Sequence, residues 1–175
     1  AGATTLIYML KKQLQANYKV VGIEVDRKDF SLFNDPNLIS TTSQDFAKEL
    51  MKAKDFDIIL VDLNGTDNED ACSDILYLIE PSTIKLNKMI RRNRSIFEKL
   101  KGKKIVLNKS LLDSKDVLDF EYEAKTQVYY NIPPLDDKKE KHSILDTFLS
   151  KLGFGKQNTQ DNGEKNNKIL GLFKF

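Results

Sequence analysis

The sequence is poor in the residues that build disulfide-stabilised, collagen-like or membrane-spanning chains. Its one cysteine, Cys72, cannot form an internal disulfide, which agrees with a reducing compartment. Four prolines and eight glycines exclude a collagen-like or repetitive chain. No apolar run approaches the length of a membrane-spanning helix, and there is no signal-peptide pattern. These absences favour a cytoplasmic globular protein.

The remaining composition is that of a single domain. The chain has 175 residues, of which 40% are hydrophobic and 31% are charged, and a chain of this length buries about two-thirds of its unfolded surface. A formal net charge of +2 gives no whole-molecule field that would favour nucleic acid. The single histidine, His142, lies on the polar side of a predicted helix and is assigned no catalytic role. Acidic neighbours disfavour a thiolate at Cys72.

Short apolar runs alternate with segments of helical periodicity. The run at residues 56–63, FDIILVDL, is nearly continuous, which is typical of a strand covered on both faces of a parallel sheet. Ser43 is the predicted N-cap of the second helix. We expect an α/β domain over residues 1–153, with a mostly parallel sheet and helices on both faces. Strands are predicted at residues 19–25, 56–63, 74–79, 104–107 and 127–132, and helices at 4–17, 43–54, 83–100, 113–125 and 138–152.

The C-terminal part differs in character. Residues 156–167 contain no apolar side chain, so we predict a flexible linker at 154–167. Residues 168–175, KILGLFKF, are predicted to form an amphipathic helical tail that binds an anionic membrane surface. Docking on a partner protein and packing on the chain's own domain are the alternatives. The apolar residues of the predicted tail are Ile169, Leu170, Leu172, Phe173 and Phe175.

Candidate ligand-binding residues follow the predicted strands, where ligands bind in doubly wound sheets. The opening AGATTL suits a phosphate, because backbone N–H groups at a helix start face the anion and a threonine can hold Mg²⁺. Asp26 and Asp62 end strands, where carboxylates can bind Mg²⁺ or orient water. Asn108 also follows a strand and can hydrogen-bond a base edge. The alternative is a hydroxyl-capped helix start with ordinary polar loop residues.

Several short segments occur in a characteristic order. They are GATT at 2–5, EVD at 24–26, DIILVDL at 57–63, LIEPS at 78–82, VLNK at 106–109 and IPPLD at 132–136. Together they resemble the ParA/MinD group of deviant P-loop ATPases, and especially its CpaE/TadZ-like pilus-assembly branch. The resemblance covers residues 1–152 and implies a P-loop NTPase-like fold.

The resemblance also implies a site for ATP or ADP with Mg²⁺. It assigns the phosphates to Gly2, Ala3, Thr4 and Thr5. It assigns Mg²⁺ to Thr4, Asp26 and Asp62, and further nucleotide contacts to Asn108, at the adenine, and Pro133. Ala3 stands where the family has a phosphate-binding lysine, so at most a weak ATPase is expected. The family's signature lysine and its first strand would lie upstream of Ala1.

A basic stretch covers residues 85–104. It contains nine lysines and arginines and one glutamate, Glu98, which leaves a local charge of +8 (9 − 1). Such a cluster suits DNA, an anionic membrane or an acidic partner. A solvated helix face is the alternative.

Three functions follow as hypotheses. The first is a CpaE/MinD-like positioning protein, a homodimerising nucleotide switch that recruits pilus or secretion machinery to the inner face of the membrane. The second is a scaffold that keeps the fold and binds no nucleotide. The third is a ParA-like DNA-binding partition protein.

Overall fold

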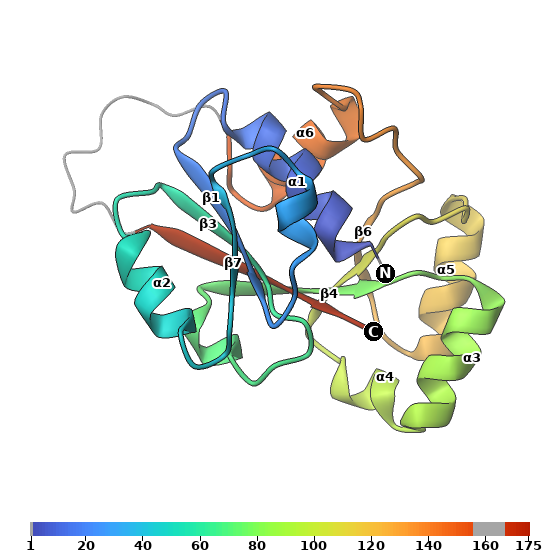
Figure 1. The fold of residues 1–175 in the computed structure, drawn as a ribbon. Coiled ribbons are helices and arrows are strands. Elements are labelled where there is room, and N and C mark those ends of the chain that lie inside the picture. The colour runs from blue at the N-terminus through green and yellow to red at the C-terminus, as the bar shows by residue number, and fades with distance from the viewer. Residues whose placement is uncertain (1, 156–166) are drawn as a thin grey trace.

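The computed structural model describes residues 2–155 and 167–175. Seven strands in this part of the chain form one parallel sheet in the order β2-β1-β3-β7-β4-β5-β6 (Figure 1). The strands are β1 (Val20–Val25), β2 (Leu38–Thr41), β3 (Ile58–Asp62), β4 (Asp74–Ile79), β5 (Lys104–Leu107), β6 (Val128–Asn131) and β7 (Lys168–Lys174). The helices are α1 (Ala3–Leu14), α2 (Phe46–Lys52), α3 (Thr83–Arg92), α4 (Ile96–Lys99), α5 (Ser114–Ala124) and α6 (Ser143–Lys151). The predicted α/β class is therefore confirmed.

Helices cover both faces of the sheet. On one face α1 and α6 pack over the largest hydrophobic cluster (Figure 1). On the other face, α2 packs over β1 and β3, while α3, α4 and α5 pack over β4 and β5. All residues of β1 and β3 are buried because each strand is covered on both faces, which is why their sequences are almost continuously apolar.

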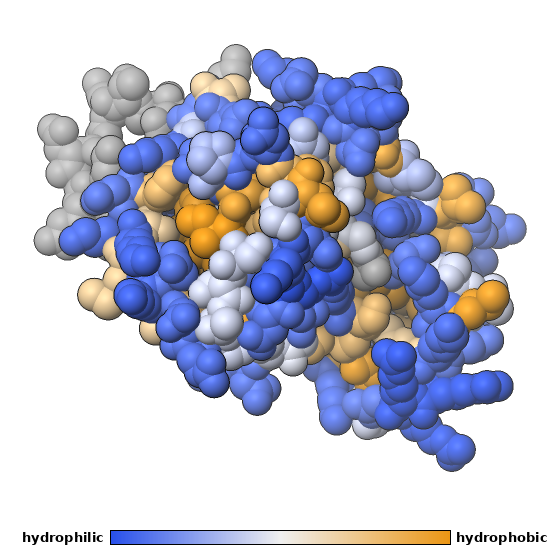
Figure 2. Space-filling model, viewed as in Figure 1, coloured by the Kyte–Doolittle hydropathy of each residue, from blue (hydrophilic) through white to orange (hydrophobic). Residues whose placement is uncertain are grey.

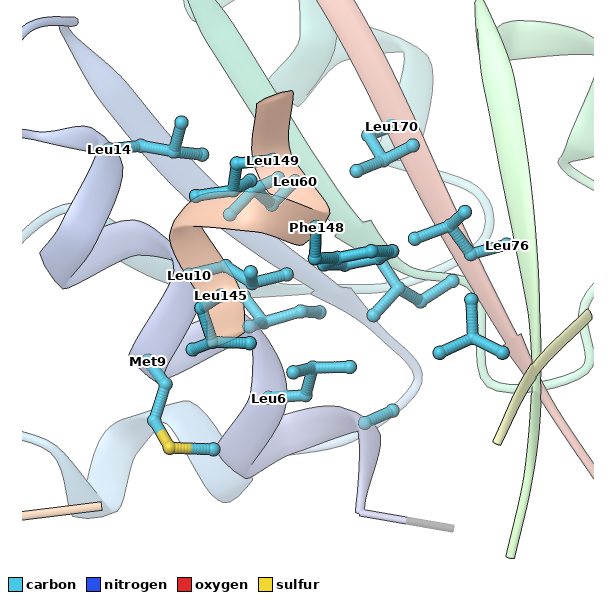
Figure 3. Close-up of a cluster of buried hydrophobic side chains, with 14 of the residues drawn as sticks. Leu6, Met9, Leu10, Leu14, Leu60, Leu76, Leu145, Phe148, Leu149 and Leu170 are labelled. Atoms are coloured by element: carbon cyan, nitrogen blue, oxygen red, sulfur yellow. The ribbon is translucent and has the colours of Figure 1, made fainter. Parts of the chain in front are cut away.

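Phe148 of α6 lies at the centre of the largest cluster. Its ring points toward the sheet among leucines from several strands, including Leu60 of β3, Leu170 of β7 and Leu76 of β4 (Figure 3). Leu10 of α1 lies on the helical side of the same cluster. The core thus joins the first and last helices to the middle of the sheet.

The C-terminal segment corrects the prediction of a helical tail. Residues 168–174 form β7, which pairs in parallel with β3 on one side and with β4 on the other. Leu170 and Leu172 are 2% and 0% exposed, whereas a membrane tail needs its apolar side chains free. Ile169 and Phe173 pack on the opposite face of the sheet. Because the segment is covered on both faces, its apolar residues follow one another without the alternation expected at an exposed surface.

Several elements differ from the prediction in their bounds or in their number. The short strand β2 lies at residues 38–41, where no strand is predicted. The predicted helix at 83–100 is two helices, because Asn93 has an extended backbone and its side-chain oxygen accepts hydrogen bonds from the Ser95 N–H and hydroxyl. Asp45, not Ser43, precedes the first residue of α2. The last helix begins at Ser143.

The remaining predictions on the C-terminal part concern the linker and the membrane. Most of the predicted linker, 156–166, lies outside the described residues. Among the described residues, no helix is both long enough and apolar enough to cross a membrane.

Candidate functional site

The N-terminus of α1 lies at the carboxyl edge of the sheet. Gly2 precedes the helix with φ +74°, and its carbonyl accepts the first helical hydrogen bond, from the Leu6 N–H at 3.0 Å. Within the described residues, no side chain caps this end and the first turn contains no acidic residue. The positive end of the helix dipole is therefore not neutralised by its own first turn. Ala3 is buried, and Thr4 and Thr5 are partly buried.

Asn108 and Lys109 come next to Gly2 from the carboxyl end of β5. A Cβ atom placed on Gly2 would lie 2.8 Å from Lys109 Cε, 3.1 Å from Asn108 Nδ2 and 3.4 Å from Lys109 Nζ. Only glycine fits here, both for this space and for its positive φ. Lys109 itself has φ +51°, the left-handed region, and is exposed. An ammonium group therefore lies beside the start of α1 although position 3 is alanine.

Two buried carboxylates lie on neighbouring strands at the same edge. Glu24 of β1 is opposite Asp62 of β3 in the register, and both are 0% exposed. Glu24 Oε1 accepts from the Phe30 N–H at 2.8 Å and the Ser40 hydroxyl at 2.6 Å. Asp62 Oδ1 accepts from the Asn64 N–H at 3.0 Å. The second oxygen of each, Glu24 Oε2 and Asp62 Oδ2, is buried and has no hydrogen-bond partner among the described residues.

Burial raises the pKa of Asp62 above its ordinary value, because the ionised form has lost its hydration. The hydrogen bond from Asn64 and the positive charge of Arg27 oppose this shift. A buried carboxylate whose second oxygen has no partner among the described residues is stabilised when it binds a cation or a proton.

Asp26, which the sequence analysis assigns to Mg²⁺ together with Asp62, bonds to Ser43 in the structure. It is exposed and has φ +55°, and its two oxygens accept from the Ser43 N–H at 3.0 Å and the Ser43 hydroxyl at 2.6 Å. These bonds lower the pKa of Asp26. The carboxylate directly opposite Asp62 is thus Glu24. No group of three or more His, Cys, Asp or Glu side chains in the described part of the chain could hold a metal by itself.

Pro133 follows β6 at the same edge and is partly buried. The residue before it is tied to β5 and to the loop that follows β5: the Ile132 N–H donates to Leu107 O at 2.8 Å, and the Ser110 N–H donates to Ile132 O at 2.9 Å. Parallel strands therefore bring the first turn of α1, Asp62, Asn108 and Pro133 to one edge.

Cys72 lies away from this set, packed on the cluster beneath α2. Burial, and secondarily the charge of Glu69, raise the pKa of its thiol from 9.0 to about 11. Two pKa units reduce the thiolate fraction about a hundredfold. We expect Cys72 in the folded protein to react with iodoacetamide at pH 8 at least tenfold more slowly than in urea-unfolded protein. Equal rates of mass gain in the two states would contradict this placement.

The basic stretch is spread over several elements, with Arg94 between α3 and α4 and Lys99 at the end of α4. Lys85, Lys88, Arg91 and Arg92 lie on α3 and are exposed, and hydrophilic side chains project from this region at the lower right of Figure 2. Lys85 pairs with Glu80 at 2.5 Å. The lysines at residues 101–104 lie at the start of β5, at the opposite edge of the sheet from Gly2.

Sequence reasoning missed two residues of this site. Lys109 adjoins Asn108 but was not singled out, because a lysine in a loop carries no signal of its own. Glu24 was noted only as part of an acidic element. Its signal is a carboxylate inside a run of buried apolar residues, a position that needs a specific partner. Comparisons with protein-family models, with curated proteins and with solved structures found no match for this chain.

Proposed function

We propose that the protein is a nucleotide-responsive switch of the ParA/MinD type, akin to the CpaE/TadZ-like branch, that binds ATP or ADP with Mg²⁺ at the carboxyl edge of the sheet. One observation carries the proposal. Within the described residues, a fully buried Asp62 with an unpaired oxygen shares an edge of the sheet with a helix N-terminus that no side chain caps and with a lysine ammonium. Phosphate and Mg²⁺ together would satisfy all three groups.

The residues present fit that ligand in separate roles. The N–H groups of the first turn of α1, with the hydroxyls of Thr4 and Thr5, would hold phosphate oxygens. Asp62 would hold Mg²⁺ directly or through water, with Glu24 beside it. Mg²⁺ needs only one or two protein carboxylates when phosphates and water supply the other ligands. Asn108 and Pro133 would contact the nucleoside.

Lys109 would supply the positive charge that Ala3 lacks. Lys109 lies on the loop after β5 and not in the phosphate-binding turn. We expect it to bind the phosphate of the bound nucleotide without stabilising the charge that develops in the transition state of phosphoryl transfer. At most a weak ATPase is expected. We propose a homodimer that recruits a protein partner such as pilus or secretion machinery. Membrane binding through residues 168–175 is not part of the proposal, because β7 uses these residues in the sheet.

A scaffold that binds no nucleotide is the second candidate. The observation that favours it is Ala3, which is 2% exposed and packed in the main core where the family has a charged lysine. The two candidates differ in what ATP does to stability.

The test is thermal unfolding with and without ATP and Mg²⁺. A ligand at one hundred times its dissociation constant stabilises the native state by about 2.7 kcal/mol. We expect millimolar ATP with Mg²⁺ to raise the melting temperature of the wild type. The Lys109→Ala variant should bind ATP with Mg²⁺ at least about tenfold more weakly than the wild type, since a charge-assisted hydrogen bond contributes about 1.5–3 kcal/mol.

Lys115→Ala is the matched control, because Lys115 is an exposed lysine on α5. It should respond to ATP as the wild type does. No stabilisation of the wild type at millimolar ATP would reject the nucleotide switch in favour of the scaffold.

A further inference from the structure

A second concave site lies at the amino edge of the sheet, where β5 and β6 begin. It is a cavity of about 450 Å³. Asn108 and Lys109 follow the far end of β5, so the strand separates this cavity from the carboxyl edge. The proposed nucleotide site does not use any residue that lines the cavity.

Five lysines line the cavity, and they come from separate segments of the chain. Two lie in the turn before β5, one begins β5, one directly follows α5 with a left-handed backbone, and one is the last residue of α6. The described residues that line the cavity include no aspartate or glutamate. These lysines are Lys101, Lys103, Lys104, Lys125 and Lys151.

Contacts inside the protein hold some of these lysines in place. Lys104 forms an ion pair with Asp74. Lys151 donates to the carbonyl of Tyr129 at 2.6 Å, and its Nζ lies 4.3 Å from the centre of the Tyr129 ring. Lys104 Nζ lies 5.3 Å from the same ring centre. Two ammonium groups of residues that line the cavity are therefore held in place by contacts within the protein.

The other three lysines of the set have no carboxylate partner among the described residues, and Lys103 Nζ lies 5.7 Å from the centre of the Tyr77 ring. Lys101, Lys103 and Lys125 are exposed. The negative end of a helix dipole favours a lysine after α5 or at the end of α6, but it does not bring lysines from the start of β5 to the same hollow. Like charges around one cavity repel one another, and an anion inside it would remove that repulsion.

We propose that this cavity binds a small phosphate compound with several negative charges. A volume of about 450 Å³ is in the range of small-molecule sites, about 300–1,000 Å³. Lysine ammonium groups bind phosphate as point charges and suit an oligophosphate that several of them contact at once. The site is separate from the nucleotide site and does not depend on it.

Inorganic tripolyphosphate is the probe, titrated into the full chain at low ionic strength and without Mg²⁺ by calorimetry and by amide NMR spectra. The test variant is Lys101→Gln with Lys125→Gln, two side chains that form no ion pair within the described part of the chain. The control is Lys48→Gln with Lys115→Gln, which removes the same charge from exposed positions on α2 and α5.

We expect the wild type and the control to bind with similar affinity and the test variant to bind about tenfold more weakly. The amide signals of Gln127 and Val128, in the cavity wall, should shift in the first two proteins. Equal affinity of all three proteins would overturn the proposal, as would shifts confined to Gly2 and Thr4. A duplex DNA oligonucleotide that binds while tripolyphosphate does not would overturn it as well, in favour of a nucleic-acid surface.

Discussion

Replacing Leu172 with alanine should lower the free energy of unfolding by about 2–5 kcal/mol. Leu172 is fully buried in the centre of the sheet, where β7 lies between β3 and β4. Truncation removes apolar contacts from the main cluster and leaves a cavity that neighbours on three strands cannot readily fill. For a domain whose total stability is about 5–15 kcal/mol, this is a large fraction.

The measurement is urea unfolding followed by circular dichroism, with Lys168→Ala as the control. Lys168 belongs to the same strand but is exposed. Its replacement should change the free energy of unfolding by less than about 1 kcal/mol. If the last eight residues were a free tail, both variants would unfold at the wild-type urea concentration, and that result would contradict the position of β7.

Replacing Asp62 with asparagine should raise the free energy of unfolding at pH 7 by about 1–3 kcal/mol in the absence of ligand. The wild-type carboxylate is buried next to a second buried carboxylate on β1, and one of its oxygens has no partner in the part of the chain that the structure describes. Asparagine keeps the size and the acceptor for the Asn64 N–H while it removes the charge. The free energy of unfolding increases because asparagine carries no charge whose hydration is lost on burial.

The pH dependence has a definite sign. In the unfolded chain Asp62 ionises near its ordinary value of 3.8, but in the folded protein its pKa is raised. Between these two values the native state holds a proton that the unfolded state has released, so stability falls as pH rises. The loss persists above the folded pKa. We therefore expect the stability advantage of Asp62→Asn to be absent below pH 3.8 and to grow as pH rises.

ATP with Mg²⁺ should reverse this order. A cation at Asp62 Oδ2 stabilises the ionised form, so the wild type should gain stability from the ligand and Asp62→Asn should gain little. Melting curves at pH 7 with and without ATP and Mg²⁺ measure both effects. If Asp62→Asn were less stable than the wild type without ligand, the Asp62 carboxylate would have a structural partner in the protein and would not need a cation.

Local sequence predicted most of the sheet because the relevant signal is local. The runs at β3, β4 and β5 are apolar except for one charged residue at an end of each, and such runs are suited to strands covered on both faces wherever they lie. β2 escaped prediction because it is a four-residue strand, of which only Leu38 is buried, so little periodicity marks it. The break after Arg92 depends on one asparagine, whose side chain bonds to Ser95 instead of continuing the helix.

The candidate site was predicted in part for the same reason. Residues at strand ends can be recognised from sequence, and this is how Asp62 and Asn108 were predicted, whereas Pro133 was assigned through the family resemblance. The sequence did not show that Glu24 lies opposite Asp62, because Asp26 and Glu24 are both acidic and close in sequence. Only the strand register places Glu24 opposite Asp62, while Ser43 takes both oxygens of Asp26.

By itself the sequence determined that this chain forms a parallel α/β sheet with polar groups at the ends of its strands. Both features depend on residues that are close in sequence, namely the apolar runs of strands covered on both faces and the polar residues of the turns that follow them. The tertiary structure alone decided where the last strand goes and which charges meet. KILGLFKF has apolar residues that suit a helix and a buried strand equally, and the choice depends on hydrogen bonds offered by β3 and β4, about one hundred residues away in sequence. The approach of Lys109 to Gly2 is likewise a contact between distant segments, set by packing and by no local pattern.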